Sequence, residues 1–359
     1  MYWNTVKDLL VPSDIPGYTG YTKLMTNVGQ TSNRGIELQL NAWLIETKDF
    51  SLNATFNIGH NKNKIDKLAS GEKEWILTSA WRNDVVNSDD YRAYVGGTSG
   101  LIYGYVNDGF YTVADFESFD SKSRTWKLKE GVVDSSPLSD TPRPGNAKFK
   151  KLTPVDPNST NPYQLTEADR TVIGNTTPKF SGGFGLNATY KGFDMSMFFN
   201  FMYDFDVLNA NKIMLTTWAD NKENNFLMDI ASDKRWRNFD DMGNEIRYSP
   251  EVLAEFNKNA TMWNPTSIGR PICMSYAVED GSFLRLNSAT LGYTLPSVWT
   301  KKVGLSKVRF YVSGNNLFTL TGYSGYDPEV NIATGLTPNI DYNRYPRSRT
   351  YTFGAQLTF

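Results

Sequence analysis

Apolar residues recur at every second position in several separate segments of this chain. Residues 350–359 place small or polar side chains between apolar ones, which are Tyr351, Phe353, Ala355, Leu357 and Phe359. A period of two is that of a β-strand with one apolar face. The other segments that read as strands are residues 2–10, 36–44, 50–58, 179–190, 193–205, 289–295 and 308–312. The pattern therefore predicts about eight strands and an all-β fold.

The polar positions of these strands separate two classes of β-protein. In residues 50–58 they are Ser51, Asn53, Thr55 and Asn57. A soluble sandwich turns its polar face to bulk water, and we expect Lys and Glu to dominate there. Small and amide side chains are typical of the crowded lumen of a membrane barrel instead.

The connectors between the strands alternate strictly between short and long. Residues 46–49 and 191–192 are short turns, and residues 296–306 form a medium one. The long segments between them are residues 11–32, 61–178, 206–280 and 317–345. Outer-membrane barrels have short periplasmic turns and long extracellular loops. We therefore expect an antiparallel transmembrane β-barrel domain over residues 1–359, with these four segments as its extracellular loops.

Composition narrows the remaining classes. Aromatic residues make up 14% of the chain and would supply the two interfacial girdles of a barrel. The net charge of −1 gives no field that attracts nucleic acid. No apolar run is long enough for a transmembrane helix. Residues 1–20 lack the features of a signal peptide, so for an outer-membrane protein we expect the natural N-terminus to be missing.

Candidate catalytic and metal-binding residues are few. His60 is the single histidine and Cys273 the single cysteine, which leaves too few ligands for zinc and no internal disulfide. His60 has no nucleophile motif nearby, so a hydrolase triad is not predicted. Two carboxylates at a set distance would allow glycosidase chemistry, but loop carboxylates are by default solvated surface. The pairs weighed are Asp89 with Asp90, Asp204 with Asp206, and Asp240 with Asp241. We predict no enzyme, no cofactor and no metal site.

Short distinctive motifs are spread along nearly the whole chain. They are Asn27–Gly29 followed by Asn33–Glu37, the NIGHNKNKI of 57–65, the YGYVNDGF of 103–110, the DRTVIGNTTP of 169–178, the YKGF of 190–193, the SFLRLNSATLGYTLP of 282–296, the VRFYVSGNNLF of 308–318, the YDPEV of 326–330 and the closing residues 347–359. These motifs resemble those of the SusC/RagA family of TonB-dependent transporters. Each motif is weak alone, but they occur in the family's order.

The resemblance implies a place for this chain within a larger protein. The family's fold is a 22-stranded barrel with an N-terminal plug and a TonB-binding segment, and this chain is similar to its C-terminal part. Plug and TonB segment are not in this sequence, so TonB would act through the missing N-terminal region. The family also implies a SusD-like surface lipoprotein as lid, glycan or peptide as substrate, and Phe359 as the terminal residue that the assembly machinery recognises.

One departure from the family concerns calcium. Many members carry an Asp-x-Asn-x-Asp-Gly loop between the equivalents of Gly145 and Asp169. Here Asp156, Asn158 and Asp169 remain as oxygen donors, but their spacing does not match a calcium loop. We do not predict calcium binding in residues 145–175.

Aromatic residues crowd two of the long loops. Aromatic faces stack on sugar rings or clamp peptides, so these residues are candidates for a substrate path, with packing of the loop core as the alternative. The candidates are Trp75, Trp81, Tyr91, Tyr94, Tyr103, Tyr105, Tyr111, Trp218, Trp236 and Trp263. Arg347 and Arg349 precede the last strand, where they would contact phosphates of outer-membrane lipid or keep a loop soluble.

The sequence thus predicts part of an outer-membrane importer of oligosaccharides or peptides. Two other functions remain open. One is a small stand-alone outer-membrane barrel of about eight strands that acts as an anchor or adhesin. The other is a secreted all-β glycan-binding domain that never enters a membrane.

Overall fold

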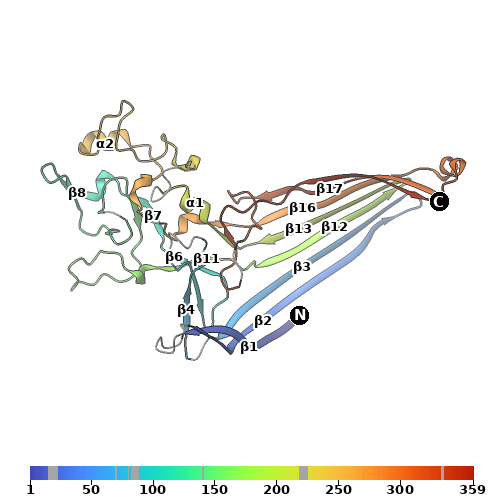
Figure 1. Ribbon diagram of the computed structural model, residues 1–359, viewed down its shortest axis with the longest axis horizontal. Helices are drawn as coiled ribbons and strands as arrows, with labels where there is room; N and C mark the ends of the chain where they lie inside the picture. Colours follow the sequence, from blue (N-terminus) through green and yellow to red (C-terminus); the bar gives the residue numbers. More distant parts are fainter. Residues whose placement is uncertain are drawn as a thin grey trace.

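A long antiparallel sheet extends from one end of the molecule, and a large assembly of loops covers the other end (Figure 1). This is a computed structural model, and it describes residues 1–14, 23–68, 71–79, 81, 89–139, 141–217, 225–269, 271–332 and 335–359. No helix among these residues is long and apolar enough to cross a membrane.

Eight strands form the sheet, as the alternation predicts, and each pairs antiparallel with the next. Their order is β1 (Tyr2–Asp14), β2 (Lys23–Glu46), β3 (Phe50–Lys67), β12 (Phe180–Tyr190), β13 (Phe193–Tyr203), β16 (Phe283–Thr294), β17 (Lys307–Thr321) and β19 (Thr350–Thr358). The described part of β1 and of β19 has no strand on its outer side, so the sheet is not closed into a barrel within this chain.

Tight turns join the strands at the end remote from the loops. Between β12 and β13 the turn is Lys191–Gly192, and Lys191 adopts a positive φ of 52°. A Cβ atom on Gly192 would lie 2.7 Å from the carbonyl oxygen of Thr294, so the close approach of β16 requires glycine here. The connector between β16 and β17 contains α3 (Ser297–Thr300) and the 3-10 turn η7 (Lys301–Val303).

The loops carry their own secondary structure. A four-stranded sheet has the order β11 (Thr171–Asn175), β6 (Leu101–Gly104), β5 (Tyr91–Tyr94) and β4 (Glu74–Leu77). A three-stranded sheet has the order β15 (Val278–Asp280), β14 (Asp206–Asn209) and β18 (Ile340–Asp341). The remaining elements are the pairs β7 (Asn107–Phe110) with β10 (Ala147–Phe149) and β8 (Phe116–Asp120) with β9 (Thr125–Leu128), the helices α1 (Ala210–Met214) and α2 (Pro250–Phe256), and the 3-10 turns η2 (Val113–Asp115), η3 (Glu167–Asp169), η4 (Met228–Ile230), η5 (Pro265–Ser267) and η6 (Ser275–Ala277).

The buried apolar core of the molecule lies in this loop assembly. One cluster packs Trp263 against Phe149, Ile230 and Met274. A second packs Tyr91 of one loop with Leu208 and Ile213 of another and Ile340 of a third. Loops of this length are uncommon in compact domains unless they fold on themselves, and these do so around shared apolar residues.

Several strands extend into the segments predicted as loops. Strands β1 and β2 run through parts of 11–32, β3 continues to Lys67 inside 61–178, and β17 continues to Thr321 inside 317–345. Residues 15–22 of the first predicted loop lie outside the described part of the chain. Apolar and polar residues alternate only in the part of a strand that has one face in lipid. Beyond the membrane both faces are polar, so the alternation ends although the backbone pairing continues.

Candidate functional site

The barrel wall has one continuous apolar face. Residues that pair across strands point to the same side of a sheet, and one such row crosses six strands. It consists of Leu40, Phe56, Phe184, Phe199, Leu286 and Phe318. Phe184 and Phe199 stack with ring centroids 4.5 Å apart, while the Leu40 side chain is 53% exposed. An exposed apolar surface of this extent marks contact with lipid or with a partner.

An aromatic row borders this face next to the short turns. Cross-strand pairing aligns Phe50, Tyr190, Phe193, Tyr293 and Phe310. The ring centroids of Phe193 and Tyr293 are 4.5 Å apart, and those of Phe50 and Tyr190 are 6.4 Å apart. Aromatic side chains at the edge of an apolar band form the interfacial girdle of an outer-membrane barrel.

The opposite face of the sheet is polar and pairs its own side chains. The Asn53 amide donates to Asn41 Oδ1 over 2.7 Å, and the hydroxyls of Ser51 and Thr189 lie 2.6 Å apart. Near the short turns, Arg309 Nε donates to Asp194 Oδ1 over 2.9 Å. Side chains of this kind agree with the lumen face that the sequence predicts.

A cluster of charged side chains attaches the last loop to the wall. Arg285 of β16 is 2% exposed and donates to both carboxylate oxygens of Asp327, over 2.5 and 3.2 Å. Glu329 lies 3.0 Å from Arg285 Nε and 3.3 Å from Arg347, as an ion pair in each case. Burial opposes ionisation of Asp327, but hydrogen bonds from Arg285 outweigh it and hold the pKa below its ordinary value.

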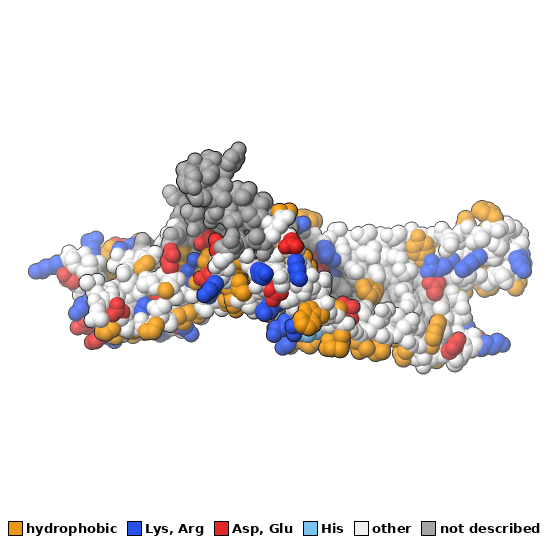
Figure 2. Space-filling model, turned by 90° about the horizontal axis from the view of Figure 1, so that it is seen from below, with side chains coloured by type: hydrophobic (Ala, Val, Ile, Leu, Met, Phe, Trp, Pro, Cys, Tyr) orange, Lys and Arg blue, Asp and Glu red, His pale blue; other side chains and the backbone are white. Residues whose placement is uncertain are grey.

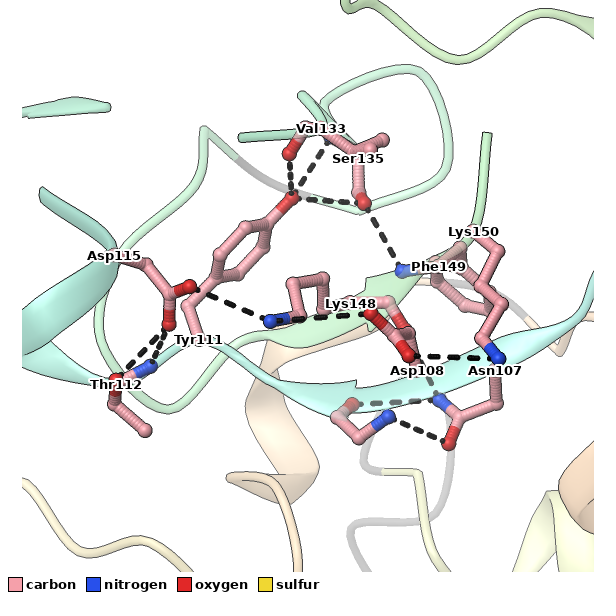
Figure 3. A network of polar contacts seen from close by, with 11 residues as sticks. Asn107, Asp108, Tyr111, Thr112, Asp115, Val133, Ser135, Lys148, Phe149 and Lys150 are labelled. Carbon is pink, nitrogen blue, oxygen red and sulfur yellow. Dashed lines mark hydrogen bonds and ion pairs between the residues drawn. The ribbon is translucent and has the colours of Figure 1, made fainter. Parts of the chain in front are cut away.

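A polar network stabilises a further part of the loop assembly (Figure 3). The Tyr111 hydroxyl lies 2.6 Å from the Val133 carbonyl oxygen and 2.8 Å from Ser135 Oγ, and it accepts from the Ser135 N–H over 3.0 Å. Lys148 sits between Asp115 and Asp108, at 3.4 and 3.9 Å. The ring of Tyr111 is fully buried. Burial raises the pKa of Tyr111 to about 12, so this phenol stays protonated.

Most of the predicted substrate-path aromatics are buried in the loop assembly. Because protein covers their ring faces, the structure favours for them the alternative of loop-core packing. Tyr91, Tyr111 and Trp263 are fully buried, and Trp81, Tyr105 and Trp236 nearly so. The Tyr91 hydroxyl donates to the Pro338 carbonyl oxygen over 2.5 Å and so joins two different loops. Trp263 Nε1 donates to the Thr216 carbonyl oxygen over 3.3 Å and so joins two distant segments of one loop.

The other predicted aromatics lie nearer the surface. Trp75 and Tyr103 are half-buried, and Tyr103 has the Arg170 guanidinium 4.5 Å from its ring centroid. Tyr94 is exposed and is the one of these three that lines a groove. Trp218 lies outside the described residues.

The groove beside Tyr94 lies where strands β3 and β12 cease to pair with each other. Strand β12 pairs with β3 as far as Gly59, whereas β3 continues to Lys67 and meets the β5 side of the loop assembly. The groove has a volume of about 680 Å³. It is lined mainly by polar side chains. Among those that the sequence pattern did not mark as candidates are Asn61, Asn63, Lys64, Asn175 and Lys179. Such amides and charges would bind a hydroxyl- or amide-rich ligand.

The region considered for calcium is held by other contacts. Asp169 accepts hydrogen bonds from the backbone N–H groups of Leu152, Thr153 and Thr166, at 2.9, 2.7 and 2.8 Å. The Lys151 ammonium lies 3.4 Å from its carboxylate. Burial opposes ionisation, but these hydrogen bonds hold the pKa of Asp169 well below its ordinary value. Among the described residues, no three His, Cys, Asp or Glu side chains are grouped for a metal.

Three of the residues weighed for catalysis, His60, Asp204 and Asp206, line the groove beside Tyr94. His60 Nδ1 lies 2.6 Å from the Lys179 carbonyl oxygen. Asp204 pairs with Lys179 at 3.2 Å, and Asp240 accepts hydrogen bonds from Met242 and Asn244 within its own turn. Each group therefore has a local structural role.

No protein-family model matches the chain. It is 32% identical to the TonB-dependent receptor P3 of Formosa agariphila and 27% identical to the TonB-dependent receptor SusC of Bacteroides thetaiotaomicron, in each case over its whole length. It covers 32% and 29% of those proteins, so it spans about a third of the length of the relatives it matches. In fold it is similar to a chain in the structure of the RagAB peptide transporter, with a TM-score of 0.67 and 22% identity over 99% of this chain and 32% of that one.

The resemblance to SusC/RagA-type TonB-dependent receptors is thus confirmed along the whole chain. The chain is similar to these receptors over its whole length and forms an antiparallel wall of an outer-membrane β-barrel. Its apolar face is the lipid face, since a secreted domain would have to expose that face to water. The two open edges argue against a complete eight-stranded barrel, because unpaired backbone groups are costly in lipid.

Proposed function

We propose that this chain supplies part of the wall and outer mouth of a TonB-dependent importer for oligosaccharides or peptides. The observation that carries the proposal is the two-faced sheet with folded loops at one end only. A barrel wall with a polar lumen and a substantial assembly at one mouth is suited to passage of a polar solute. The mechanism we propose is passage of the solute, without bond chemistry.

The loop assembly is the part that we propose to face the outside and to seat a SusD-like lipoprotein. Its attachment through Arg285, Asp327 and Glu329 would give such a lid a rigid base. The structure with the similar fold is that of the RagAB peptide transporter, which supports peptide as one substrate class. The resemblance of the motifs to the SusC/RagA family supports the pairing with a lid. TonB would act through segments outside this sequence, and we propose that Phe359, which is 90% exposed, aids assembly.

Deletion of the gene in its host tests the proposal. We expect lost growth on one class of oligosaccharide or peptide, restored by the gene on a plasmid and abolished again when TonB is depleted. A tag on the complete protein should co-purify a surface lipoprotein from the outer-membrane fraction. Unchanged growth on every such nutrient, together with loss of surface adhesion, would favour the anchor or adhesin function instead.

A further inference from the structure

The lipid face of the wall changes from apolar to basic within one step along the strands. Ile36, Leu38 and Leu40 of β2 point outward and are about half exposed. The next position on the same face is Arg34, which pairs across the sheet with Lys62 of β3. On its other side Arg34 pairs with Trp3 of β1. Trp3, Arg34 and Lys62 thus form one row, which we name the basic row.

The height of the basic row matches the level of lipid headgroups. The aromatic row at the short turns contains Phe50, and Lys62 lies twelve residues further along the same strand. At about 3.3 Å per residue the two rows are roughly 40 Å apart along the strand. A strand tilt of about 40° reduces this to roughly 30 Å across the membrane, which is the thickness of a hydrocarbon core. The basic row therefore lies where acyl chains end and phosphates begin.

The two cations of the row are available to an anion. Within the part of the chain that the structure describes, neither Arg34 nor Lys62 forms an ion pair, whereas the neighbouring Lys64 pairs with Asp66 at 3.5 Å. The Arg34 guanidinium lies 3.9 Å from the centroid of the Trp3 ring, so its plane is held in place. Basic side chains gather beside apolar ones where the strands meet the loop assembly (Figure 2).

A hollow accompanies the row. It has a volume of about 550 Å³ and is lined by Trp3, Arg34, Ile36, His60 and Lys62, together with the first two residues of the chain. Apolar surface below and two cations above complement a molecule with acyl chains and a phosphate. A soluble anion would gain nothing from Ile36 and the exposed leucines beneath it.

We propose that the basic row and its hollow bind the phosphate headgroup of a lipid in the membrane leaflet on the loop side. Arg34 supplies a planar pair of donors to phosphate oxygens, Lys62 adds a second positive charge, and Trp3 anchors at the interface. The lipid's acyl chains lie along Ile36, Leu38 and Leu40. The site rests on the proposed orientation, in which the loop assembly faces the outside, but not on transport, so a loss of the transport function would leave it standing.

Native mass spectrometry of the complete protein, purified and delipidated in detergent, tests this site with diphosphoryl lipid A as probe. We expect the variant carrying Arg34→Gln and Lys62→Gln to bind it about ten-fold more weakly or worse. It lacks two cations, each of which adds to the affinity for an anionic headgroup. The matched control carries Lys122→Gln and Lys129→Gln, two exposed lysines in and beside the β8–β9 hairpin, and should bind as the unaltered protein does.

Further arms identify the source of the phosphate and guard against misfolding. Phosphate-free lipid A should bind far less well, and millimolar inorganic phosphate should not displace the lipid. Trp3→Ala, which removes no charge, should weaken binding by a smaller factor. Equal binding of phosphorylated and phosphate-free lipid would overturn the proposal. Displacement of the lipid by inorganic phosphate would overturn it as well. So would an equal loss of lipid binding in the test and control variants, provided that both variants are folded, as shown by a shift of their gel bands on heating.

Discussion

Arg285 of the barrel wall and Asp327 of the last loop share two hydrogen bonds in a nearly dry environment. Removing one member of a buried ion pair typically costs about 3–5 kcal/mol. Here Glu329, 3.0 Å from Arg285 Nε, remains to offset part of the charge, so we expect a loss toward the lower end of that range. We therefore expect Asp327→Asn to release residues 322–332 from the wall. Hydrogen exchange of the complete protein in detergent should rise strongly there, whereas Arg347→Gln, which removes a half-exposed partner, should have little effect.

The same pair predicts how the loop responds to acid. The pKa of Asp327 in the folded protein lies below its ordinary value of 3.8, so its ionised form stabilises the attachment. That contribution is present at every pH above 3.8 and is lost as the pH falls through the lower folded value. Exchange in 322–332 should stay constant from neutral pH down to about 4, after correction for the intrinsic rate, and increase only below it. A rise already at pH 6 would contradict the assignment.

Tyr111 tests whether the predicted aromatics stabilise the loops or bind substrate. Tyr111→Phe keeps the buried ring but leaves the Val133 carbonyl group and Ser135 without their partner. An unsatisfied buried polar group costs about 1–3 kcal/mol, so the loop assembly should melt at lower temperature. Tyr94→Phe, at an exposed position, is the control and should leave the melting temperature unchanged. Reduced substrate uptake with unaltered melting for Tyr111→Phe would restore the substrate-path interpretation.

The assignment of the two faces predicts opposite effects at neighbouring positions. Leu40→Lys places a charge on the lipid face, where it costs about 2–4 kcal/mol near the middle of the membrane. Gln39→Lys places the same charge on the lumen face and should be tolerated. Urea titration of the complete barrel in lipid vesicles measures both free energies of unfolding. Equal destabilisation by the two variants would show that the faces are wrongly assigned.

Calcium removal should leave residues 151–169 unchanged. Asp169 already accepts three backbone N–H groups and lies beside Lys151, so an added cation would have to displace an ammonium group. We expect exchange rates in this segment to be the same with and without a chelator. Asp169→Ala, in contrast, should raise them, because it removes the acceptor of all three donors.

The open edges predict how the chain behaves by itself. Strands β1 and β19 present unpaired backbone groups, which lipid does not tolerate. Expressed alone and transferred into micelles, residues 1–359 should aggregate or remain unfolded. A heat-modifiable monomer under these conditions would show that the two edges can close on each other, and the small-barrel function would then deserve direct tests.

The sequence pattern predicts the orientation of aromatic residues in the strands but not the burial of those in the loops. Phe184 and Phe199 stand in alternating segments, so their face could be predicted without coordinates. Tyr91 and Trp263 stand in loops without a regular period, where nothing in the local pattern distinguishes a buried ring from an exposed one. Their burial depends on partners more than forty residues away, such as Pro338 and Thr216.

By itself the sequence determined the strands in contact with lipid, their approximate number, the sorting of turns and loops, and the family. These follow from constraints that act on every second residue. Lipid on one side of the sheet and a polar lumen on the other make apolar and polar residues alternate along each strand. Only the tertiary structure decided how far the strands extend beyond the membrane, which aromatics are core, and that Arg285 meets Asp327. Those features rest on backbone pairing and long-range contacts, which impose no period on the chain.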